Sequence, residues 1–79
     1  MHDDIIPLHL LPAGQLAQVD QLFGDVELVH RLEEMGVRSG VTVEMVQTGL
    51  PCIIRLDGHK LCFRSSEACN VLVRPESAS

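Results

Sequence analysis

Two glycines set four residues apart, Gly36 and Gly40, separate two different patterns in the middle of the chain. Before them, apolar residues recur at the helical spacing: Leu28, Val29, Leu32 and Met35. After them, residues 41–47 alternate between apolar and polar, which is typical of a half-buried strand. Gly36 stands one residue past the helical pattern, where a left-handed backbone ends a helix and a Cβ atom costs about 1 kcal/mol. Gly40 is predicted to close a turn, so the chain passes directly from a helix into a sheet.

The predicted helix begins after Asp25, a residue type that is favoured at the N-cap position. Glu27 and Arg31 stand four residues apart with the acid first, so we expect them to pair on the solvent-facing side of the helix. At the other end of the helix, Val37 is placed to pack back onto Leu32.

Residues 52–64, CIIRLDGHKLCFR, carry the pattern of a β-hairpin, with Asp57 and Gly58 as a two-residue type I′ turn. If Leu56 opposes His59, alternation divides the side chains between two faces. One face holds Cys52, Ile54, Leu56, Leu61 and Phe63, with His59 at its tip. The other face holds Ile53, Arg55, Lys60, Cys62 and Arg64. We expect the first set to face the core.

Three further segments complete the predicted secondary structure. Residues 15–23 are predicted to form a strand, with a bulge or twist at Leu22, where the alternation breaks. Residues 65–69 can form one helical turn capped by Ser65, and residues 70–75 a last strand. About five short strands, with one helix after the first strand, indicate a mainly β fold. Such a set can close into a small barrel, which removes exposed edges.

The segment ahead of these strands is rich in breaks, with Pro7, Pro12 and Gly14 close together. It is predicted to be an irregular lead-in, and Leu8 and Leu11 are expected to pack against the core.

Size and charge exclude several classes of function. A chain of 79 residues is one small domain with a thin margin of stability. The net charge of −5 speaks against general nucleic-acid binding, which needs a basic footprint. No apolar run is long enough to span a bilayer, and the start of the chain carries aspartates where a secretory signal would carry positive charge. Three cysteines at loose spacing do not form a disulfide framework, so reduced thiols in the cytoplasm are expected.

Local motifs of catalysis are absent from the sequence. It contains no phosphate loop, no GxGxxG and no GxSxG, and its two phenylalanines, without Trp or Tyr, supply no aromatic peptide groove. We therefore expect no enzyme activity.

Metal ligands are available only as scattered side chains. His30 and Glu34 lie four residues apart on the solvent-facing side of the predicted helix, and two such ligands alone bind weakly. His59 at the hairpin tip and the exposed Cys62 are further candidates. Cys52 is expected in the core, on the opposite face from Cys62, so these two cysteines should not share a metal.

The outer face of the hairpin carries a stripe of basic side chains on an acidic protein. Arg55, Lys60 and Arg64 are either a solvated strand face or a docking surface for an acidic partner, because charge segregated against the net sign orients encounters. Exposed Cys62 and Arg38, in the turn after the helix, would extend that surface.

Several segments together carry a family resemblance. Leu8, Leu11 and Gly14 come first, then Val19 and Gly24. The most specific part is RLEEMGVRSGVTVEMV (31–46), followed by PCIIRLDGHKLCFR (51–64) and VLV (71–73). This series resembles the FeoA family, small SH3-like proteins of bacterial ferrous iron uptake. The resemblance implies an SH3-like barrel at 8–74, a flexible lead-in at 1–7 and a frayed tail at 75–79.

The resemblance also implies how such a protein works. It would be a cytoplasmic accessory or regulator of FeoB, the membrane GTPase and iron permease, with no required cofactor, no direct membrane insertion and no nucleic-acid partner. A weak homo-oligomer is left open. The alternative function is a small metal-binding protein that carries or senses Fe(II) or a similar ion, with Fe or Zn held at the surface by the candidates above.

Overall fold

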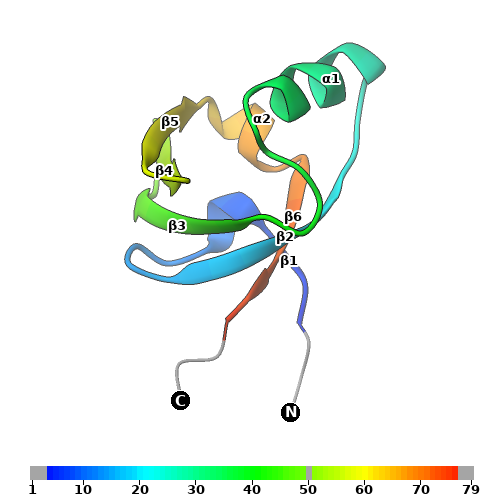
Figure 1. Ribbon diagram of the computed structural model, residues 1–79. Coiled ribbons are helices and arrows are strands. Elements are labelled where there is room, and N and C mark those ends of the chain that lie inside the picture. Colours follow the sequence, from blue (N-terminus) through cyan, green and yellow to red (C-terminus); the bar gives the residue numbers. More distant parts are fainter. Residues whose placement is uncertain (1–3, 50, 77–79) are drawn as a thin grey trace.

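The sheet that organises the molecule is antiparallel throughout. The structure is a computed structural model that describes residues 4–49 and 51–76. Within those residues the strands are β1 (Ile6–Pro7), β2 (Leu16–Leu22), β3 (Thr42–Gln47), β4 (Cys52–Leu56), β5 (His59–Phe63) and β6 (Val71–Pro75). Their order across the sheet is β1-β6-β2-β3-β4-β5. The helices are the 3-10 turn η1 (Leu8–Leu10), α1 (Val26–Glu34) and α2 (Ser65–Ala68). Figure 1 shows the strongly bent sheet, with α1 and α2 beside each other above one end.

The end of α1 confirms the prediction made from the glycines. The Val37 N–H donates to the Leu32 carbonyl at 2.9 Å, and the Gly36 N–H donates to the Glu33 carbonyl at 3.0 Å. These two bonds define a Schellman ending, and Gly36 has the left-handed φ of 100° that it requires. Val37 and Leu32 are both buried, so the expected apolar contact across the helix end is in place.

The turn that follows α1 is also as predicted. Gly40 has a φ of 95°, and the Val41 N–H donates to the Arg38 carbonyl at 3.1 Å, which closes the turn. The Gly40 N–H then donates to the Val19 carbonyl of β2 at 2.7 Å. The same turn therefore also fixes the start of β3 against β2.

The start of α1 agrees with the prediction only in position. Asp25 is the N-cap residue, with an extended backbone, and its carbonyl accepts from the Val29 N–H at 3.0 Å. Its side chain makes no capping hydrogen bond. Asp25, Val26 and Glu27 are exposed, so solvent can satisfy the first N–H groups of the helix.

The hairpin has the predicted turn and register. Leu56 opposes His59, and Asp57 and Gly58 both have positive φ, at 52° and 82°, as a type I′ turn requires. The predicted inner face is confirmed in particular by Cys52, Ile54 and Phe63, which are fully buried or nearly so.

Three details of the sheet differ from the sequence-based expectation. The described residues form six strands instead of five, because Ile6–Pro7 of the expected lead-in pairs with β6. The irregularity of β2 lies between Val19 and Gln21, not at Leu22. Asp20, the intervening residue, is turned toward Arg74, and its carboxylate accepts from that guanidinium at 3.1 Å.

The expectation of a closed barrel is wrong for the described residues, because β1 and β5 end the sheet without pairing to each other. β1 has only two residues, and Pro7 lacks the N–H that a further ladder would need. The tail predicted at 75–79 also begins later than expected. Pro75 belongs to β6, Glu76 donates its N–H to the Leu16 carbonyl at 2.9 Å, and residues 77–79 lie outside the described residues.

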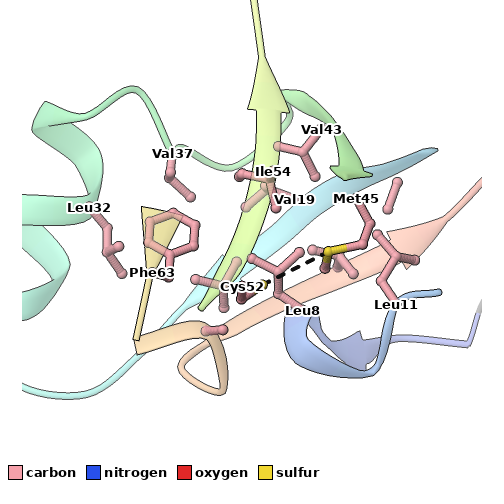
Figure 2. Close-up of a cluster of buried hydrophobic side chains, with 14 residues drawn as sticks. Leu8, Leu11, Val19, Leu32, Val37, Val43, Met45, Cys52, Ile54 and Phe63 are labelled. Carbon is pink, nitrogen blue, oxygen red and sulfur yellow. Dashed lines mark hydrogen bonds between the residues drawn. The ribbon is translucent and has the colours of Figure 1, made fainter. Parts of the chain in front are cut away.

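The core lies inside the curve of the sheet and is apolar (Figure 2). Leu8 and Leu11 of the lead-in are fully buried in it, as predicted. Cys52 belongs to it as well, and its thiol lies 3.9 Å from the Met45 sulfur, to which it donates a weak hydrogen bond. The remaining buried members are Ala17, Val19, Leu32, Val37, Val43, Ile54, Phe63, Ala68, Val71 and Val73.

Substituting Gly36 by valine tests the helix ending. A β-branched residue is forced into positive φ, and its Cβ would also lie 3.1 Å from Leu56, so we expect a loss of more than about 1 kcal/mol in unfolding free energy. Gly36→Ala and Gly40→Ala form the matched pair, since both glycines have positive φ but no atom lies within 4 Å of a Cβ at Gly40. Chemical denaturation measures all three. Wild-type stability in Gly36→Val would contradict this account of the helix ending.

Candidate functional site

The polar residues and the cysteine of the predicted outer hairpin face are exposed, whereas Ile53 on that face is half-buried. Lys60 and Cys62 point outward from β5, and Arg64 follows directly after that strand. We call these three residues the edge row. No ion pair of the described residues involves Lys60 or Arg64. The edge row therefore carries two cations that no carboxylate of the described chain neutralises.

The other predicted partner-binding cations are placed differently. Arg55 opposes Lys60 in the hairpin, but its guanidinium donates to Glu44 of β3 at 3.0 Å. Arg38 lies by a separate hollow of about 540 Å³, which Leu56 and Asp57 also line. The Nε of Arg38 donates to the Glu33 carbonyl at 3.2 Å, so this side chain helps to cap α1.

A larger hollow of about 660 Å³ opens beside the end of β5. It lies between α1, the residue that precedes β4, the last residues of β5 and α2. Its apolar lining comes from Met35, Pro51 and Phe63, and its polar lining from Arg31, Cys62, Arg64 and Glu67. Two members of the edge row therefore stand at the rim of a cavity that is large enough for a side chain of a partner.

An ion pair between the two helices bounds this hollow. Arg31 of α1 donates to Glu67 of α2 at 3.1 Å, where the side chains are 64% and 19% exposed. The predicted pair between Arg31 and Glu27 is therefore replaced, because α2 brings a better-shielded carboxylate to the same guanidinium.

Glu67 is the residue of this candidate site that the sequence analysis missed. Besides the bond to Arg31, its other oxygen accepts from the backbone N–H of Arg64 at 3.1 Å. The helix begins at Ser65, so Arg64 occupies the capping position that was predicted for Ser65. A glutamate three residues after the capping residue is the signal that could have identified this cap. Glu67 thus ties α2 to both α1 and the end of β5.

The sequence model of the FeoA domain family matches residues 6–75. The chain belongs to the FeoA family. A search of curated proteins finds no match. Membership of the family implies a role in ferrous iron transport.

Solved structures agree with this membership. An iron uptake regulatory protein, FeoA, has a TM-score of 0.86 at 24% identity, over 92% of this chain and 100% of that one. A Stenotrophomonas maltophilia FeoA complexed with zinc, described as a prokaryotic SH3 domain protein, has a TM-score of 0.76 at 27% identity, over 91% and 96%. The SH3-like fold is thereby confirmed.

The same fold also occurs inside larger proteins. IdeR of T. acidophilum matches with a TM-score of 0.86 at 13% identity, over 96% of this chain and 36% of that one. At this identity the likeness shows the fold alone.

The candidate metal ligands of this FeoA-family chain are all exposed. His30 and Glu34 lie on α1, His59 at the hairpin tip and Cys62 on the edge row. Across residues 4–49 and 51–76, no three His, Cys, Asp or Glu side chains gather closely enough to hold a metal ion. A metal at these residues stays a prediction. The search for membrane spans, made over the same residues, finds no helix that is long and apolar enough to cross a bilayer.

The three thiols differ in environment, and alkylation should follow that difference. Cys62 is exposed, Cys69 is half-buried, and Cys52 is buried in the core, where burial raises the pKa of its thiol. Because the thiolate is the reacting form, we expect iodoacetamide to modify Cys62 first and Cys52 only upon unfolding. Mass spectrometry of the labelled peptides measures the order. Cys62→Ser is the control and should lose only the fastest phase, whereas rapid labelling of Cys52 in the folded protein would contradict its burial.

Proposed function

We propose that this FeoA-family protein is a non-catalytic accessory of bacterial ferrous iron uptake. In the proposal it is cytoplasmic, binds the cytoplasmic side of a FeoB-type GTPase permease and regulates that permease. Family membership supports the link to iron transport. The observation that carries the binding role is the edge row, where Lys60 and Arg64 present positive charge that no described carboxylate neutralises, on a protein of net charge −5.

The charged groups of the hollow support a binding surface more than a reactive centre. Arg31 and Glu67 are engaged with each other, and the second oxygen of Glu67 is occupied by the Arg64 backbone. These bonds connect α1, α2 and the end of β5. Lys60 and Arg64, which have no ion-pair partner among the described residues, suit recognition of an acidic surface, because complementary charge speeds and orients the encounter.

Reversing the two free charges of the edge row tests this function. We expect a Lys60→Glu, Arg64→Glu variant to bind the cytoplasmic part of a FeoB-type permease on the order of tenfold more weakly at low salt, with a flatter salt dependence than wild type. Pull-down and titration at two salt concentrations measure both. The unfolding free energy should stay within about 0.5 kcal/mol of wild type, since both side chains are exposed.

The matched controls are two arginines that are already paired. Arg74→Gln removes a cation that is bound to Asp20, and Arg55→Gln removes one that is bound to Glu44. Both should lower permease binding much less than the edge-row variant does. Equal binding by the folded edge-row variant would move the contact elsewhere, and no binding by wild type at any salt would overturn the accessory function.

The second candidate function, carriage or sensing of a transition metal, has one observation in its favour. The related S. maltophilia FeoA is a zinc complex, and Cys62 here is an exposed thiol. If this function holds, zinc titration of the metal-free protein should give a saturable site that a Cys62→Ser, His59→Ala variant weakens at least about tenfold. A His30→Ala, Glu34→Ala variant is the comparison on the helix. Calorimetry that shows identical zinc binding by all three proteins would exclude the hairpin residues as ligands.

A further inference from the structure

β5 is a free edge of the sheet. It pairs with β4 on one side and ends the strand order on the other. Figure 1 shows it at the outer end of the curved sheet, beyond β4 and next to the turn of α2. An unpaired edge is a template for an added strand, and β-strand addition is one of the common ways in which proteins bind extended peptides.

The hairpin register decides which backbone groups face this free edge. A two-residue turn makes Leu56 and His59 a hydrogen-bonded pair, and in an antiparallel ladder such pairs alternate with non-bonded ones. Leu61 and Phe63 therefore bond to β4, whereas the N–H and C=O groups of Lys60 and Cys62 point away from it. Within the described part of the chain, no backbone hydrogen bond of a turn, loop or helix cap uses these groups.

The side chains along this edge determine which charges an added strand should carry. Lys60 and Arg64 lie two residues on either side of Cys62, and neither has a carboxylate partner among the described residues. An added strand would place its own side chains directly opposite, within about 5.5 Å, where opposite charges stabilise a pair and like charges destabilise it. The edge therefore favours a strand that is acidic at two positions four residues apart.

A second copy of this chain does not meet that requirement. Two β5 strands that pair antiparallel about Cys62 would set Lys60 of each copy against Arg64 of the other, and the contact would bring together cations without acids. Edge lysines commonly block this kind of self-association.

The hollow beside β5 adds an apolar requirement. Phe63 lies at the end of the strand and lines the hollow with Met35 and Pro51. In an added strand, the side chains opposite Leu61 and Phe63 face the core side of the sheet, as those two residues do. An apolar side chain next to Phe63 would thus enter a cavity of about 660 Å³.

We propose that the free edge of β5 binds an extended acidic segment of a partner protein as an added strand. Its acidic side chains lie opposite Lys60 and Arg64, a small side chain lies opposite Cys62, and its apolar side chains turn toward Leu61 and the hollow beside Phe63. This inference rests on the proposed function for the identity of the partner, and on the edge itself for the mode of binding.

A synthetic peptide tests the binding mode directly. The probe is a blocked seven-residue peptide with glutamate at the second and sixth positions, valine at the third and fifth, and threonine elsewhere. We expect saturable shifts of the Lys60, Cys62 and Arg64 amide signals in nuclear magnetic resonance titrations, and slowed hydrogen exchange at Lys60 and Cys62. A peptide with lysine in place of both glutamates should bind at least about tenfold more weakly, because like charges then face each other.

Two modifications separate backbone pairing from side-chain attraction. N-methylation of the peptide groups that face β5 should weaken binding at least about fivefold, and it leaves the protein untouched. In the protein, Cys62→Pro removes an N–H that faces the free edge without breaking the ladder to β4, and should weaken binding similarly. Cys62→Ser keeps that N–H and should bind like wild type. Circular dichroism checks the fold of both variants, and the N-methylated peptides decide the question if Cys62→Pro does not fold.

The outcomes distinguish this inference from the proposed function. Equal binding of the methylated and unmethylated peptides, or shifts confined to residues away from β5, would overturn strand addition. So would a dimer of the free protein that Cys62→Pro dissolves, because the occupant of the edge would then be a second copy. If Cys62→Pro binds a FeoB-type permease as well as Cys62→Ser does, the proposed function stands and the inference fails. If the peptide adds to β5 but no permease binds, the inference stands and the proposed partner is wrong.

Discussion

The two-residue turn at Asp57 and Gly58 fixes the geometry on which the rest of the site depends. Both residues have the positive φ of a type I′ turn, so Leu56 must oppose His59. A slip of one residue would exchange the two faces of the hairpin, which would put Cys62 in the core and Phe63 in solvent. Burial of Cys52, Ile54 and Phe63 opposes that slip from the core side. The turn and the core thus select the same register, and the edge row follows from it.

The parts of the structure that could be predicted from the sequence are those decided within a few residues. The Schellman ending at Gly36 and the hairpin register both rest on bonds between near neighbours. The parts that could not be predicted involve partners far apart in the chain. Arg31 binds Glu67, 36 residues away, instead of Glu27 on its own helix. Ile6 pairs with Val73 of β6. Residue spacing predicts contacts between near neighbours. Contacts between distant residues depend on which surfaces the folded sheet brings together.

The candidate site shows the same division. The sequence places Lys60, Cys62 and Arg64 on one face by alternation alone, and the structure agrees that all three are exposed. Alternation does not reveal that Glu44 neutralises Arg55 while Lys60 stays free, because β3 supplies the carboxylate. It also does not reveal the hollow beside Phe63, whose walls come from α1, α2 and the segment before β4. The charge pattern is local, but the shape of the surface arises from tertiary packing.

An open strand edge exposes a small protein to aggregation. Closing the barrel would remove the unpaired groups of β5 and lower the tendency to aggregate. In this sheet the edge of β5 is open, and Lys60 and Arg64 on it repel a second copy of the same strand. The same two cations would attract an acidic strand. They would therefore both hinder self-association and select an acidic partner. The Arg31–Glu67 pair joins α1 to α2, and both residues line the hollow at the end of β5. An edge that is protected by charge, and not by a further strand, can therefore avoid pairing with a second copy and still bind a partner.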